Sequence, residues 1–139
     1  RSNGVLDAAR RLGVTLIAFS PLAQGLLTGR IHENPALVSS LPAGRRSRLS
    51  PASRNYTPKN LARTAPLVEE LRKIGKSHGV SVSQVALSWL VTYYGDTVVA
   101  IPGASRPEQA GENAAAMSLR LTQKELAQID EISARMAAG

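Results

Sequence analysis

The stretch TVVAIPGASRPEQAGENAAAM, residues 97–117, decides the fold of this chain. Residues 97–101 form a short apolar run rich in β-branched side chains, which predicts a parallel strand covered on both faces. Pro102 and Gly103 end this strand. Ser105 and Glu108 then have the spacing of a capping box, so we expect a helix to start there. The sequence therefore predicts a small-residue turn that leads from a buried strand to a helix N-terminus.

Such a turn attracts anions, because the free amides and the dipole of a helix N-terminus carry partial positive charge. Gly103 and Ala104 leave the approach open, and the guanidinium of Arg106 suits a phosphate monoester. These features favour a phosphorylated nucleotide as the ligand. The alternative is an ordinary strand, turn and helix with Arg106 solvated at its rim, and the local sequence leaves both interpretations open.

Apolar spacing predicts the other elements. We expect a helix over residues 5–12 that ends at Gly13, and a first buried strand over residues 15–19. Three further helices are expected over residues 61–78, 81–94 and 122–136, the last two with capping boxes, and a long loop without regular structure over residues 25–60. The apolar side chains that give these three helices their spacing are Leu67, Val68, Leu71, Ile74, Val82, Val85, Ala86, Trp89, Leu90, Tyr93, Leu126, Ile129, Ile132 and Met136.

The order of these elements predicts parallel strands joined by helical crossovers, hence an α/β fold. With 139 residues, 43% of them hydrophobic, the chain has the size of one globular domain. Two strands cannot close a sheet, whereas a (β/α)8 TIM barrel has about 250 residues and places phosphate-binding loops after its last two strands. We therefore expect residues 1–139 to be a single partial domain, the C-terminal part of such a barrel.

Charge and composition limit the other classes of function. The net charge of +7 is concentrated in residues 44–59, which carry five basic and no acidic residues. A nucleic-acid-binding module remains an alternative, although Tyr56 is the one aromatic residue there and no reader motif is present. The absence of cysteine excludes disulfides and thiolate sites. No apolar run approaches the roughly 20 residues of a membrane span, and we expect a cytoplasmic protein, with a plastid location as the alternative.

Two segments resemble the aldo-keto reductases. Residues 14–30, VTLIAFSPLAQGLLTGR, and residues 98–117 are similar to the seventh and eighth strand regions of that family. The nearest subgroup contains pyridoxal-reductase-like enzymes and potassium-channel β-subunits, and the resemblance covers nearly the whole chain. It implies the C-terminal half of a barrel whose parent reduces aldehydes or ketones by hydride transfer from NADP(H).

The resemblance also implies two cofactor-binding segments. The first would lie along the diphosphate and ribose, with a basic residue near the phosphates, and the second would meet the 2′-phosphate and the adenine. Helical spacing puts the last three residues of the second segment on one helix face, for which a solvated face is the alternative. The implied residues are Ser20, Pro21, Leu22, Ala23, Gln24, Gly25 and Arg30 in the first segment, and Gly103, Ala104, Ser105, Arg106, Gln109, Glu112 and Asn113 in the second.

The family's catalytic Tyr, Lys, Asp and His belong to the first half of the barrel and have no counterpart in this chain. The tyrosines and histidines that are present fit helix faces, a helix end or loops, and they predict neither a catalytic nor a metal site. We therefore expect this chain alone to be inactive and its parent to act on a small carbonyl substrate. A non-catalytic interaction subunit is an alternative, and a fragment standing alone is expected to form a homodimer. The basic residues 44–59 are expected to cover the bound cofactor.

Overall fold

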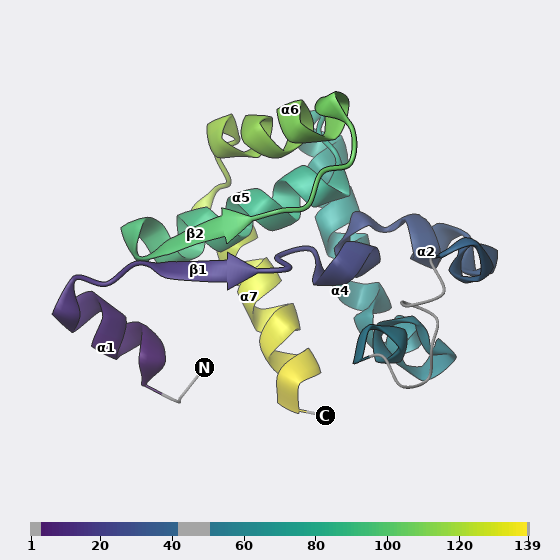
Figure 1. Cartoon of the computed structure of the whole chain (residues 1–139), viewed down its shortest axis with the longest axis horizontal. Coiled ribbons are helices and arrows are strands. Elements are labelled where there is room, and N and C mark those ends of the chain that lie inside the picture. Colours follow the sequence, from purple (N-terminus) through teal and green to yellow (C-terminus); the bar gives the residue numbers. More distant parts are fainter. Residues whose placement is uncertain (1–3, 42–50, 139) are drawn as a thin grey trace.

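The computed structural model describes residues 4–41 and 51–138. Its centre is a parallel pair of strands, β1 (Leu16–Phe19) and β2 (Val98–Ile101), which lie side by side in Figure 1. The register runs from Leu16 opposite Val98 to Phe19 opposite Ile101. Both strands lie within the predicted ranges, and the predicted parallel arrangement is confirmed.

Helices make up most of the rest of the described chain. The four helices predicted from apolar spacing are present as α1 (Val5–Leu12), α4 (Pro58–His78), α5 (Val82–Tyr94) and α7 (Gln123–Ala138). The helix α4 begins three residues before its predicted start, because Thr57 caps it and Pro58 occupies its first turn. The helix predicted after β2 is α6 (Pro107–Ala115).

The long loop predicted over residues 25–60 is wrong in its described parts, which contain several short helices. Asn34 starts one of them by accepting a hydrogen bond from the Ala36 amide at 3.2 Å, with Pro35 in its first turn. Glycine and proline therefore separate short helical turns in this region and do not abolish them. The short elements are α2 (Arg30–Glu33) and the 3₁₀ turns Ala23–Thr28, Pro35–Ser40 and Pro51–Tyr56; two more 3₁₀ turns, Gly95–Thr97 and Ala116–Ser118, lie further along the chain.

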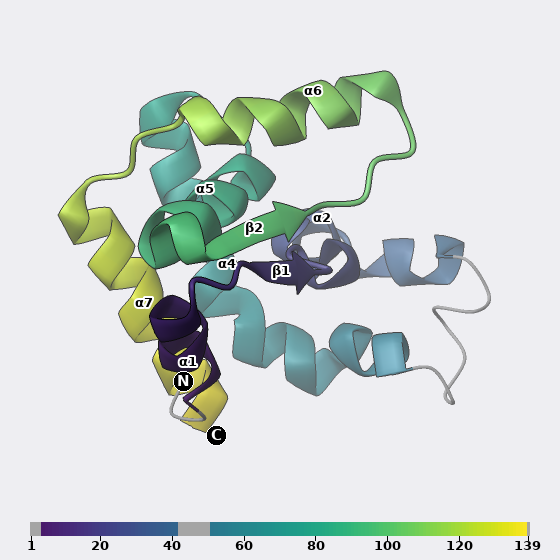
Figure 2. The ribbon, with the colours of Figure 1, turned by 60° about the vertical axis from the view of Figure 1, so that its left-hand side comes forward.

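A hydrophobic core forms where α4, α5 and α7 meet. Leu71, Val85 and Ile129 are each at most 2% exposed there, and Trp89 packs against the same cluster. The helix α5 also contacts β2, and α6 packs beside α5 (Figure 2). One helical layer therefore supports one face of the sheet, and it carries α6 next to the end of β2.

The opposite face of the sheet is not covered by any of the described residues. Ile17 and Phe19 of β1 are 65% and 79% exposed, and Val99 and Ile101 of β2 are 45% and 50% exposed. The prediction that the strands are covered on both faces is therefore wrong for the described structure. Each strand is apolar throughout because both faces of the sheet carry apolar side chains. Among the described residues, only one of these faces has a covering layer.

Candidate functional site

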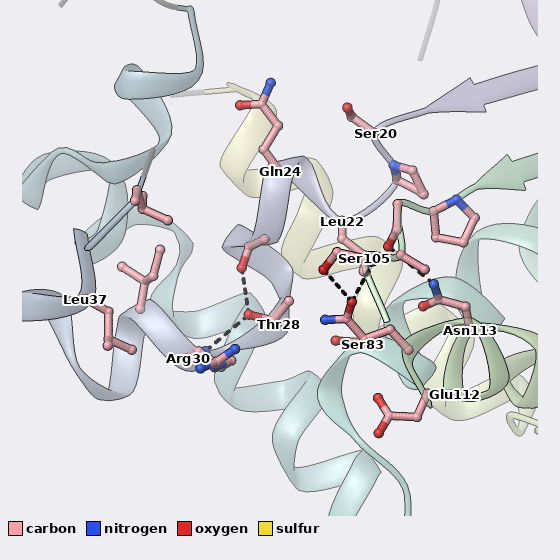
Figure 3. A pocket seen from close by; sticks show the side chains of 18 of the residues that line it. Ser20, Leu22, Gln24, Thr28, Arg30, Leu37, Ser83, Ser105, Glu112 and Asn113 are labelled. Carbon is pink, nitrogen blue, oxygen red and sulfur yellow. Dashed lines mark hydrogen bonds between the residues drawn. The ribbon is translucent and has the colours of Figure 1, made fainter. Parts of the chain in front are cut away.

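A cleft of about 550 Å³ lies at the carboxyl ends of the two strands (Figure 3). The segment that follows β1 forms one wall and the turn that follows β2 forms the other, because parallel strands end at the same edge of a sheet. The residues that line it are Ser20, Pro21, Leu22, Gln24, Gly25, Thr28, Arg30, Ile31, Leu37, Ser40, Leu41, Ser83, Pro102, Gly103, Ala104, Ser105, Gln109, Glu112 and Asn113.

The structure brings the two predicted segments together. All the predicted cofactor residues except Ala23 and Arg106 line this one cleft. Sequence reasoning missed Ser83, which is in the first turn of α5, and a group of lining residues further along the first wall: Thr28, Ile31, Leu37, Ser40 and Leu41. Ser83 comes from a helix start whose local sequence indicated only a cap, and the others come from a region interpreted as an unstructured loop. No sequence signal therefore identified them as lining residues.

The segment after β1 has an unusual backbone. Ser20, Ala23 and Gln24 adopt left-handed conformations with φ of 51°, 47° and 59°, and Gly25 follows with φ of 103°. Left-handed conformations at residues other than glycine cost on the order of 1 to 3 kcal/mol each and cluster at ligand-binding sites. The Ala23 amide donates to the Ser20 carbonyl at 2.8 Å, which closes the turn. This strained wall is a feature expected of a binding site and not of a simple connection.

The turn after β2 differs from the prediction. Arg106 is the N-cap of α6, with φ −141° and ψ 150°, and its side chain makes no capping hydrogen bond. The predicted capping box of Ser105 and Glu108 is therefore wrong, because Pro107 occupies the first helical position and moves the cap to Arg106. Gln109 replaces Glu108 as the partner: its Oε1 accepts from the Ser105 amide at 2.8 Å and from the Ser105 hydroxyl at 3.0 Å.

The backbone of this second turn is accessible. A Cβ added at Gly103 would meet nothing within 4 Å, so the predicted open approach is confirmed. Asn113 reaches back from α6 and donates to the Gly103 carbonyl at 3.5 Å. The turn is thus braced by Gln109 and Asn113 while its small residues face the cleft, which leaves room for a ligand beside the α6 N-terminus.

Charges of both signs border the cleft. Arg30 supplies a positive side chain on one wall and Glu112 a negative one on the other. Arg106 is exposed next to Ser105 but is not part of the lining, so the structure does not bring its guanidinium into the cleft. The arrangement can hold a ligand that carries anionic groups on one side and hydrogen-bond donors on the other.

The wall that carries Arg30 is fixed to α4. Arg72 of α4 pairs with Glu33 of α2 at 2.9 Å and with Glu69 at 2.6 Å. His32 contacts the Thr64 hydroxyl through Nε2 at 2.9 Å, and burial, followed by the charge of Arg72, lowers the pKa of His32. His32 thus lies in α2, which corrects its interpretation as a loop residue.

The predicted basic cover, residues 44–59, lies partly outside the described residues. Arg45, Arg46 and Arg48 lie in residues 42–50, whereas Arg54 and Lys59 are described and exposed. In residues 4–41 and 51–138 no three metal-ligating side chains gather. A search of the same residues finds no helix with the length and apolar character of a membrane span.

Parallel strands with a ligand-sized cleft at their carboxyl ends define an α/β protein of the kind that binds small molecules or cofactors at that edge. The comparison with known families is more specific. The sequence model of the Aldo/keto reductase family matches residues 1–134, and the chain belongs to this family. The resemblance predicted from the sequence is therefore confirmed.

Individual relatives agree. The chain is 41% identical to L-glyceraldehyde 3-phosphate reductase of Escherichia coli K12, over 93% of this chain and 36% of that protein. It is 30% identical to aldo-keto reductase yakc [NADP(+)] of Schizosaccharomyces pombe, over 92% of this chain and 35% of that protein. A probable pyridoxal reductase of the same yeast is 26% identical over 94% of this chain and 38% of that protein.

A solved structure supports the fold. The crystal structure of a thermostable aldo-keto reductase in complex with the inhibitor epalrestat matches with a TM-score of 0.60 and 27% identity, over 94% of this chain and 34% of that chain. The chain spans about a third of the length of the curated relatives and of the solved protein that it matches.

Proposed function

We propose that this chain forms the NADP(H)-binding part of an aldo-keto reductase-type oxidoreductase. The observation that supports the proposal most strongly is the shared cleft, because two segments about eighty residues apart, each implied by the family resemblance to hold the cofactor, line it together. A relative with 30% identity carries NADP(+) in its name. The strained turn and the accessible Gly103 backbone fit a ligand that is bound largely by main-chain groups.

Different residues of the chain would bind different parts of the cofactor. The turn formed by Leu22, Gln24 and Gly25 would lie along the diphosphate, and Arg30 would supply a cation beside it. Ser105 and the α6 N-terminus would meet the 2′-phosphate. Arg106 would turn from its exposed position to the same group, since it is adjacent to Ser105 and makes no side-chain cap.

In the whole protein, NADPH held by these residues would supply a hydride for the carbonyl carbon of an aldehyde or ketone. The residues that give the carbonyl oxygen its proton would lie outside this chain, in the part of the barrel that the 139 residues do not include. Residues 1–139 would then be one partial domain of a (β/α)8 barrel, with a small carbonyl compound as the partner. The relative that acts on L-glyceraldehyde 3-phosphate supports a small aldehyde as a first substrate to test.

The proposal is tested by blocking the cleft. Gly103→Val adds a side chain where the structure has open space, at a position whose backbone tolerates it, and we expect loss of NADPH binding by calorimetry in the full-length protein. Gly111→Val is the matched control, because Gly111 also has open space around it but lies outside the lining. Absence of NADPH and NADH binding by the unaltered protein, or equal binding by both variants, would contradict the proposal.

A further inference from the structure

The strained turn after β1 is held from outside by the 3₁₀ segment Pro51–Tyr56. The Tyr56 hydroxyl donates to the Gln24 carbonyl at 2.7 Å, and the side-chain Nδ2 of Asn55 donates to the Ala23 carbonyl at 3.3 Å. Both acceptors belong to residues with left-handed backbones, and both donors lie 32 residues further along the chain. The two carbonyls are therefore fixed by a segment that is not their neighbour in sequence.

The segment that provides these donors is itself fixed. Asn60, in the first turn of α4, donates through Nδ2 to the Asn55 carbonyl at 2.9 Å. The Thr57 hydroxyl accepts from the Asn60 amide at 3.2 Å, which caps the 21-residue helix α4. Tyr56 is only 6% exposed, so its ring is packed while its hydroxyl reaches the turn. The contact therefore links a rigid helix to one wall of the cleft.

We propose that Tyr56 is a positioning residue that holds the turn in the shape the cleft requires. A left-handed residue other than glycine returns to a right-handed or extended conformation unless surrounding contacts prevent it. Such a change at Gln24 would rotate its carbonyl away from Tyr56 and move the backbone that lines the cleft. Loss of the Tyr56 hydroxyl reduces the fraction of molecules with the competent turn, and apparent ligand affinity falls in proportion to that fraction.

The inference rests on the proposed function for its ligand, NADPH. The anchoring of the turn by Tyr56 does not depend on that ligand. Tyr56→Phe removes the hydroxyl and keeps the packed ring. Tyr94→Phe is a matched control, since Tyr94 is half-buried and its ring packs against Trp89 and Tyr93 of the same helix α5. In the full-length protein without ligand, we expect hydrogen exchange of the amides of residues 21–28 to accelerate about tenfold in Tyr56→Phe and to stay unchanged in Tyr94→Phe.

NADPH affinity is the second measurement. We expect the dissociation constant to rise about 5- to 20-fold in Tyr56→Phe, as for loss of one hydrogen bond, and to stay unchanged in Tyr94→Phe. Val98→Ala, which removes a buried side chain at the amino end of β2, opposite the end where the cleft lies, separates this effect from general destabilisation. It should lower the melting temperature without changing exchange at residues 21–28 or the dissociation constant.

Unchanged exchange at residues 21–28 in Tyr56→Phe would overturn the inference, and so would acceleration in Tyr56→Phe that spreads evenly over the core helices. A further case assumes that the unaltered protein binds NADPH. If exchange in Tyr56→Phe then accelerates locally but the dissociation constant for NADPH does not change, Tyr56 anchors the turn without positioning the cofactor, and the inference is also wrong. If the unaltered protein does not bind NADPH, the proposed function fails while exchange still decides whether Tyr56 anchors the turn.

Discussion

Arg106 occupies the N-cap of α6 with its backbone alone, and its side chain is exposed beside the cleft. If it turns to a 2′-phosphate, Arg106→Ala should weaken NADPH binding in the full-length protein by about 1 to 3 kcal/mol, the range of a charged hydrogen bond, and leave NADH nearly unchanged. Calorimetric titration with both cofactors measures this. Arg135→Ala is the control, since Arg135 pairs with Glu131 on α7. Equal weakening of NADPH and NADH binding would mean that Arg106 contacts a group that both cofactors contain.

Glu125 links stability to pH. Burial raises the pKa of Glu125, but hydrogen bonds from Thr122 and from His78, 2.8 Å away, outweigh it and leave the pKa below its ordinary value of 4.5. A lowered carboxyl pKa stabilises the fold above pH 4.5, and this contribution disappears as the pH falls through the folded-state value. Glu125→Gln keeps the capping geometry without the charge. The free energy of unfolding, measured in urea, should therefore fall less steeply below pH 4.5 in this variant than in the unaltered protein. An equally steep fall in both proteins would contradict the link between Glu125 and stability.

Two elements show why local sequence predicts some helix starts and not others. Ser81 and Gln84 form the predicted capping box at 2.9 and 3.2 Å, and Thr122 and Glu125 form another. The same spacing at Ser105 gives no box, because Pro107 determines the helix start. The strands and long helices follow from local patterns. The short helices near the cleft depend on distant contacts such as Arg72 with Glu33, which local sequence does not reveal.

The caps provide a test at the scale of one element. Ser81→Ala removes the acceptor for the Gln84 amide, and we expect a loss of about 1 kcal/mol in the free energy of unfolding, typical of a lost N-cap. Ser105→Ala should cost less, since Ser105 does not cap α6 and its exposed hydroxyl only shares Gln109 with its own amide. Chemical denaturation of the two variants compares them directly. An equal or larger loss for Ser105→Ala would mean that Ser105 does stabilise the start of α6.

At the scale of the molecule, the sequence predicts the residues of the cleft better than it predicts what covers the faces of the sheet. Parallel strands bring the two recognised segments to one edge, so the positions of Gln24 and Ser105 follow once the strands are known. The role of Tyr56 does not follow, because nothing in its local sequence indicates a buried hydroxyl bonded 32 residues away. The apolar runs of the strands show only that both faces are apolar. They cannot show which polypeptide covers the second face.

That uncovered face gives the last prediction. Phe19 and Ile101 are paired in register and are 79% and 50% exposed, and covering large apolar side chains yields about 1.5 to 3 kcal/mol each. The 139-residue chain alone should therefore self-associate through this face. Replacing both residues with Thr should shift sedimentation toward the monomer, whereas Leu12→Thr on α1, itself 75% exposed, should not.

The full-length protein should behave differently if further strands of a barrel cover this face. The same double replacement would then leave the oligomeric state unchanged and lower the free energy of unfolding by several kcal/mol, because both side chains would be buried. Sedimentation and chemical denaturation of the two lengths of protein distinguish these cases. A 139-residue chain that stays monomeric at all concentrations would contradict self-association through the sheet. A full-length protein insensitive to the replacement would contradict the barrel interpretation, because the face would then be solvent-exposed in both.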